Sequence, residues 1–145
     1  MDLHKYAKTL KTTRKSQYHH GCVVSSKGRV MSIRTNEIGL LYDTTLGSYR
    51  CLHAEYMALR YLVRMIGYDI YRLKLDVSVI RSDLGNSKPC SQCLQYMRKF
   101  NIRKVTYSMD HKFVTERFGN MYNDHLSHTQ KKLLQSSVSR VHNGN

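Results

Sequence analysis

Two short stretches of this chain, H-A-E at residues 53–55 and P-C-S-Q-C at residues 89–93, contain side chains whose types and spacing suit metal chemistry. His53, Cys90 and Cys93 supply one imidazole and two thiolates, which are ligands that zinc accepts. Three protein ligands leave the fourth tetrahedral position open for a water, as a catalytic zinc site requires. Because zinc lowers the pKa of a bound water toward neutrality, we predict a catalytic zinc (Zn²⁺) site here.

Glu55 follows the histidine by two positions and is our candidate catalytic residue. An activated water reacts only if a nearby group takes up and returns its protons, and a carboxyl group can do both as a general acid and base. The alternative is a closed structural zinc site without catalysis. Such a site needs a fourth protein ligand, for which Cys51 is the nearest candidate.

Both stretches fall where a helix is expected to begin. Pro89 suits a helix start, and two cysteines three residues apart lie on one face of that helix near its positive end, which favours thiolate. Apolar residues recur at helical spacing over residues 54–65, so the H-A-E stretch should open a second helix. Two helix starts then face one ion. Backbone N–H groups near Ala54 and Cys90 are candidates for stabilising negative charge that develops on a substrate.

In this order, H-A-E, a strand-like run and P-C-x-x-C resemble the zinc site of the cytidine and deoxycytidylate deaminase superfamily, which includes the tRNA adenosine deaminases. The resemblance covers roughly Gly21 to Ser108. It implies a three-layer α/β fold, a mixed central sheet with helices on both faces, and a hydrolase that acts on the C–N bond of a cyclic amidine. It further implies that Asn36 contacts the substrate sugar, although this residue equally suits a turn. Finally, it implies a homo-oligomer in which a neighbouring chain completes the substrate pocket.

The rest of the chain should supply the elements that position these residues. Residues 2–15 have the pattern of an amphipathic helix, which should cover one face of the sheet. Residues 35–52 show little periodicity and are predicted to be a loop. His19 and His20 are adjacent on an extended segment and point to opposite faces, so a surface or hydrogen-bonding role is expected. Strands are predicted at residues 21–24, 29–33, 73–79, 105–107 and 112–115.

We expect one zinc-dependent deaminase domain at residues 1–134, with a terminal helix at 122–134. A basic tail at 135–145, rich in Ser, Asn and Gly, favours disorder. No apolar run is long enough for a membrane span, so no membrane partner is expected. The first residues lack the apolar core of a signal peptide. We therefore expect an intracellular, reducing compartment, cytoplasmic or nuclear, in which cysteines are thiols or ligands.

The charge of the chain favours a polyanionic partner. Lys and Arg number 24 against 10 Asp and Glu, which gives a formal net charge of +14. Eleven tyrosines and three phenylalanines add aromatic surface on which unpaired bases can stack. The basic residues are spread along the chain rather than gathered in one run.

The zinc-site residues are common to cytosine and adenine deaminases, so the substrate must be argued from other positions. L-Q-Y after Cys93 replaces the small residues of the adenosine deaminases. The chain also lacks the tryptophan that precedes P-C in the polynucleotide cytidine deaminases of animals. These departures favour cytosine in a nucleotide, as in deoxycytidylate deaminases, or in single-stranded nucleic acid. The alternatives are a tRNA adenosine deaminase, or a basic nucleic-acid-binding or packaging protein that keeps the fold.

Overall fold

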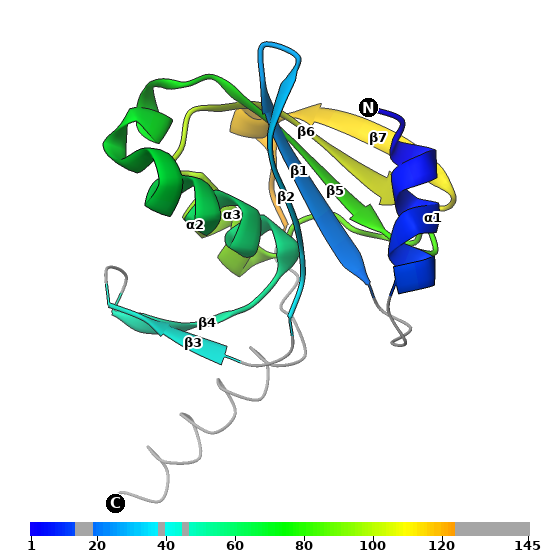
Figure 1. Ribbon diagram of the computed structural model, residues 1–145, viewed down its shortest axis with the longest axis horizontal. Helices are drawn as coiled ribbons and strands as arrows, with labels where there is room; N and C mark the ends of the chain where they lie inside the picture. The colour runs from blue at the N-terminus through cyan, green and yellow to red at the C-terminus, as the bar shows by residue number, and fades with distance from the viewer. Residues whose placement is uncertain (14–18, 38–39, 45–46, 124–145) are drawn as a thin grey trace, which may run out of the picture.

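The computed structural model describes residues 1–13, 19–37, 40–44 and 47–123, and its centre is a five-stranded sheet of order β2-β1-β5-β6-β7 (Figure 1). The strands are β1 (His20–Ser26), β2 (Arg29–Thr35), β5 (Leu75–Arg81), β6 (Ile102–Met109) and β7 (Lys112–Arg117). β1 pairs antiparallel with β2 and β5, β5 pairs parallel with β6, and β6 pairs antiparallel with β7. The sheet is therefore mixed, and all five predicted strands are present.

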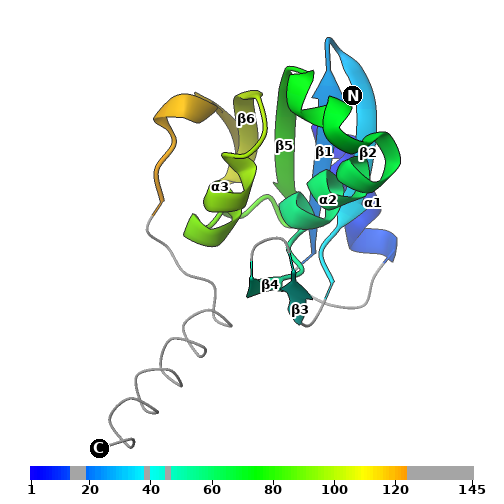
Figure 2. The ribbon, with the colours of Figure 1, turned by 90° about the vertical axis from the view of Figure 1, so that its left-hand side faces the viewer.

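Helices cover both faces of the sheet and produce three layers (Figures 1 and 2). α1 (Leu3–Thr13) lies on one face, while α2 (Ala54–Ile66) and α3 (Ser91–Met97) lie together on the other. Short 3₁₀ helices follow α2 and β7, as η1 (Gly67–Arg72) and η2 (Phe118–Asn120). The predicted α/β architecture is confirmed. In the described part of the chain, no helix combines the length and apolar character that crossing a bilayer would take.

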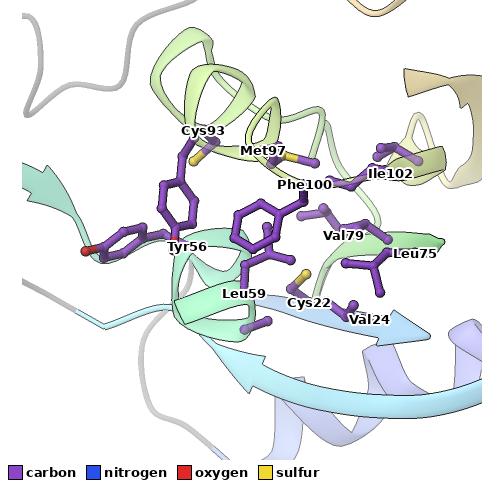
Figure 3. Close-up of a cluster of buried hydrophobic side chains, with 14 of the residues drawn as sticks. Cys22, Val24, Tyr56, Leu59, Leu75, Val79, Cys93, Met97, Phe100 and Ile102 are labelled. Atoms are coloured by element: carbon purple, nitrogen blue, oxygen red, sulfur yellow. The ribbon is translucent and has the colours of Figure 1, made fainter. Parts of the chain in front are cut away.

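Alternation along the strands divides the apolar side chains between two clusters. Cys22 and Val24 on β1 face α2 and α3, whereas Val23 between them faces α1, because successive strand residues point to opposite sides. The larger cluster joins the sheet to α2 and α3, and its members include Cys22, Val24, Leu59, Leu75, Val79 and Met97 (Figure 3). The smaller one consists of Ala7, Leu10, Val23 and Ile80. The larger cluster therefore fixes α2 and α3, which carry the candidate site, against the sheet, and the smaller cluster fixes α1.

The segment between β2 and α2 differs from the prediction. Residues 35–52 were expected to form a loop, but they contain a hairpin of β3 (Leu40–Asp43) and β4 (Ser48–Cys51), which makes a separate two-stranded sheet. Strands of four residues are too short to show a clear alternation. Tertiary contacts stabilise them instead: the Tyr56 hydroxyl donates to the Asp43 carboxylate, and the Gln92 amide donates to the carbonyl of Tyr49.

Strand-helix-strand spacing in the sequence predicts parallel neighbouring strands, and the structure agrees for one of the two such units. The unit β5-α3-β6 ends in a parallel hydrogen-bonded pair. The preceding unit, β2-α2-β5, does not, because β1 lies between its two strands. The expected basic tail, the domain boundary at residue 134 and all but the first two residues of the expected helix at 122–134 lie outside the described residues.

Candidate active site

The three expected zinc ligands converge where α2 and α3 begin. His53 is the N-cap residue of α2 and Cys90 is the N-cap residue of α3, both with extended backbone, and Cys93 lies in the first turn of α3. His53 Nδ1 lies 3.3 Å from Cys93 Sγ and 3.6 Å from Cys90 Sγ. The ligand atoms all lie within 4.8 Å of one another, although 37 residues separate His53 from Cys90. The two helix starts therefore face one point, as the sequence predicted.

These separations fit a zinc ion. Tetrahedral zinc with bonds of about 2.3 Å to sulfur and about 2.0 Å to nitrogen holds its nitrogen and sulfur ligands roughly 3.5 Å apart. The two observed distances lie close to that value. Among the described residues the cluster has three ligands, which leaves one tetrahedral position for a water. The side chain of Cys51, the candidate fourth ligand, lies outside what the structure describes.

The thiol pair is prepared to bind a cation. The pKa of Cys90 is lowered to about 4, because the Cys93 thiol donates a hydrogen bond to its sulfur and because His53 lies close by. The hydrogen bond with Cys90 holds the proton on the Cys93 thiol and raises the pKa of Cys93, and burial raises it further. A divalent cation would replace that proton between the two sulfurs, since the thiolate is the form that binds metal. The donor set thus matches Zn²⁺ in chemistry as well as in distance.

Glu55 is the second residue of α2 and lies beside the cluster. Its side chain is buried, with 4% of its surface exposed. Burial raises the pKa of this carboxyl group, while the nearby His53 and a hydrogen bond with Cys93 act in the opposite direction. Buried carboxyl groups whose pKa is raised are typical of acid-base catalysis.

The starts of both helices also present backbone donors. The first N–H groups of a helix have no partner within the helix. Neither N-cap side chain, His53 nor Cys90, caps its own helix, because both belong to the ligand cluster. Ala54, the first residue of α2, is fully buried. A role for the Ala54 backbone in stabilising substrate charge stays a prediction.

Asn36 directly follows β2, and its side chain has a structural partner. The N–H of His20 donates to Asn36 Oδ1 at 2.9 Å, and the Asn36 N–H donates to the His20 carbonyl at 3.1 Å. This reciprocal pair ties the end of β2 to the start of β1. It matches the turn role considered for Asn36, whose contact with a substrate sugar stays a prediction.

Three features near the cluster were not identified from the sequence. His20 is partly buried, and its pKa is lowered to about 4, mainly by burial and further by Arg81 and His53. His19 is almost fully buried instead of lying on the surface. Ser87 and Ser108 form a buried pair with their hydroxyls 2.8 Å apart, and Ser87 Oγ also donates to the carbonyl of Val79 at 2.6 Å. This pair holds the loop that leads to Cys90, and only the fold brings its two members together.

Comparisons with known proteins agree with this geometry. The family model of the cytidine and deoxycytidylate deaminase zinc-binding region matches residues 1–109. Among solved structures, the chain is similar to a cytidine deaminase from Burkholderia pseudomallei, with 20% sequence identity and a TM-score of 0.56. That likeness covers 86% of this chain and 96% of the other, and it confirms the fold. No curated protein matches the chain.

Proposed function

Because this chain belongs to the cytidine and deoxycytidylate deaminase family and is a zinc-dependent deaminase, we propose that it hydrolyses the amino group of a cytosine base. The base is carried by a nucleotide of the deoxycytidylate kind or by single-stranded nucleic acid. The observation that carries the proposal is the buried carboxyl group of Glu55 beside the three-ligand cluster of His53, Cys90 and Cys93.

Glu55 moves the protons of this reaction. When bound, the zinc ion supplies a water of lowered pKa and polarises it for attack. Glu55 accepts a proton from the water as its oxygen bonds to C4 of cytosine, and passes this proton to ring nitrogen N3. It then takes the remaining proton of the water from the C4 hydroxyl and delivers it to the exocyclic amine, whose bond to C4 breaks. Water is consumed, ammonia leaves, and cytosine becomes uracil. The raised pKa of Glu55 supports this role, because the same group must hold a proton and release it within one turnover.

The surroundings of the cluster support the positioning of a base. The hairpin β3–β4 is joined to α2 through Asp43 and Tyr56 and to α3 through Tyr49 and Gln92. It is therefore held against both helices that carry the ligands. Such a wall restricts the orientations of a planar ring beside Glu55. Backbone N–H groups at Ala54 and Cys90 stabilise negative charge on the base.

A substrate screen with one zinc-loaded preparation tests this proposal. Cytidine, deoxycytidylate, single-stranded DNA, RNA, adenosine and tRNA are incubated in parallel, and uracil and hypoxanthine products are separated by chromatography. We expect uracil from at least one cytosine substrate and no hypoxanthine. Hypoxanthine as the sole product would support the adenosine deaminase alternative. Absence of product from every substrate would support the packaging alternative.

A further inference from the structure

Two hollows lie along the outer side of α2, toward its C-terminal half. The larger has a volume of about 440 Å³ and the smaller about 340 Å³. Both are lined by Arg60 and Arg64, so they meet at these residues and form one surface, which we call the α2 groove. The larger hollow extends to η1 and to Lys99 after α3, and the smaller extends to Arg34 on β2.

Positive charge dominates the α2 groove. Arg34, Arg60, Arg64 and Lys99 line it, against two acidic residues. One acid, Asp43, accepts the hydroxyl of Tyr56. Among the residues that the structure describes, none of the four cations forms a salt bridge, since the three salt bridges use other basic side chains. Clustered cations without ionic partners attract a polyanion.

Tyrosine rings line the α2 groove together with these cations. Tyr68 has 89% of its surface exposed, so its ring contributes little to the core. Tyr71 stacks on Phe100, with 5.2 Å between ring centroids and an angle of 23°, which fixes its orientation beside Tyr68. In the smaller hollow, the Arg34 guanidinium lies 3.9 Å from the centroid of the Tyr61 ring. Aromatic rings and cations that line the same surface suit the unpaired bases and phosphates of a single strand.

We propose that the α2 groove binds several consecutive nucleotides of single-stranded DNA or RNA. Arg60, Arg64 and Lys99 contact phosphates, and bases stack on Tyr68 and Tyr71. Arg60 and Arg64 are one helical turn apart and present two cations about 6 Å apart along the axis. A duplex hides its base faces, so it leaves the tyrosines unused. A second copy of this chain carries the same net charge of +14 and is disfavoured as the occupant.

The α2 groove leads toward the ligand cluster. Arg60 lies seven residues after the N-cap His53, which is about 10 Å along a helix that rises 1.5 Å per residue. A strand held in the groove can therefore extend one further base to the cluster. The delivery of a base to the ligand cluster rests on the proposed function, whereas binding of a strand in the α2 groove does not.

Fluorescence anisotropy with a labelled single strand of about 16 nucleotides, an upper site size for comparable grooves, tests the proposal on the full chain. The test variant combines Arg60→Gln, Arg64→Gln and Lys99→Gln. The matched control combines Lys5→Gln, Lys104→Gln and Arg117→Gln. These exposed cations belong to α1 and to the β6–β7 pair, on the opposite side of the sheet from α2. Both variants lose the same charge, so only position distinguishes them.

We expect the test variant to bind at least tenfold more weakly, with the slope of log affinity against log salt reduced by about 2. The control should stay within about threefold of the parent. Tyr68→Ala should weaken single-strand binding by about tenfold and leave duplex binding unchanged. Tyr122→Ala, which removes an exposed ring outside the groove, should have no effect.

Equal losses in the test and control variants would overturn the proposal, as would a parent chain that binds no single strand at low salt. Light scattering in which Arg60→Gln, Arg64→Gln and Lys99→Gln change the oligomeric state would assign the groove to a second copy and overturn it too. The two proposals fail separately. Deamination of deoxycytidylate without strand binding removes only the groove proposal, and strand binding without any deaminated product removes only the proposed function.

Discussion

The Tyr56 hydroxyl donates a hydrogen bond of 2.5 Å to the carboxylate of Asp43. Tyr56 lies on α2 directly after Glu55, and Asp43 is the last residue of β3. The tyrosine is buried, and its ring packs edge-on against Tyr96 of α3. One side chain therefore links the hairpin to both helices whose starts hold the ligand cluster.

Tyr56→Phe removes this hydrogen bond and keeps the ring. Because a hydrogen bond to a charged group contributes more than a neutral one, we expect the free energy of unfolding to fall by about 1.5–3 kcal/mol in urea titrations. Asp43→Asn should also lower the free energy of unfolding. In the double variant the two losses should not add, since both remove one contact. Full additivity would mean that the contact contributes nothing to stability.

Glu55→Gln keeps the size of the side chain and removes its ability to carry protons. We expect zinc content equal to that of the parent, measured by metal analysis, and a kcat lower by about two to four orders of magnitude on the best cytosine substrate. The three ligands are unchanged, so a loss of zinc would point to a structural role for the carboxyl group. Undiminished turnover would refute Glu55 as the proton carrier.

Cys93→Ala should lose both zinc and stability, because binding free energy from a metal adds to folding free energy. A chelator should lower the melting temperature of the parent and leave that of the variant unchanged. Cys22→Ala is the matched control, since Cys22 is equally buried but lies in the core outside the ligand cluster. It should lose some stability and keep its zinc. Full zinc occupancy in Cys93→Ala would contradict the ligand assignment.

His20 should make the stability of the fold depend on pH. Its pKa is lowered to about 4 in the folded chain, against about 6.5 when unfolded. Between these values the unfolded state binds more protons, so stability is complete above about pH 6.5 and falls as the pH drops toward 4. The full loss is about 3 kcal/mol.

Urea titrations of the parent and of His20→Gln across this pH range measure that loss. Zinc release in acid affects both proteins alike, so the difference between their curves reports His20. We expect the variant to have the flatter dependence on pH. Parallel curves would show that protonation of His20 does not destabilise the folded chain.

The ligand cluster was predictable because its signals are local. His53, Cys90 and Cys93 are residue types that zinc selects, and Pro89 together with the apolar periodicity of α2 marks the two helix starts. The positions of the five strands of the main sheet followed from apolar alternation and from the turn residues between the strands. Each of these features is decided by residues close together in the chain.

The hairpin and the α2 groove depend on residues that are distant in the chain. β3–β4 is stabilised by hydrogen bonds that span 13 and 43 positions, from Tyr56 and Gln92. The partner of Asn36, His20, lies 16 positions away. In the groove, the spacing of Arg60 and Arg64 is visible in the sequence, but only the fold places Lys99 beside them. Contacts of this kind leave no periodic signal.

The N-cap positions of His53 and Cys90 give a bound ion the role of a cross-link. The ion ties together two points that are 37 residues apart, and the segment between them includes all of α2, η1 and β5. In an unfolded chain, bringing His53 and Cys90 together would cost the conformational entropy of the segment between them. In the folded chain the packing of the core has already brought the two residues together. A bound ion therefore stabilises the folded chain against the separation of α2 from α3, because the ligands converge only when both helices are in place.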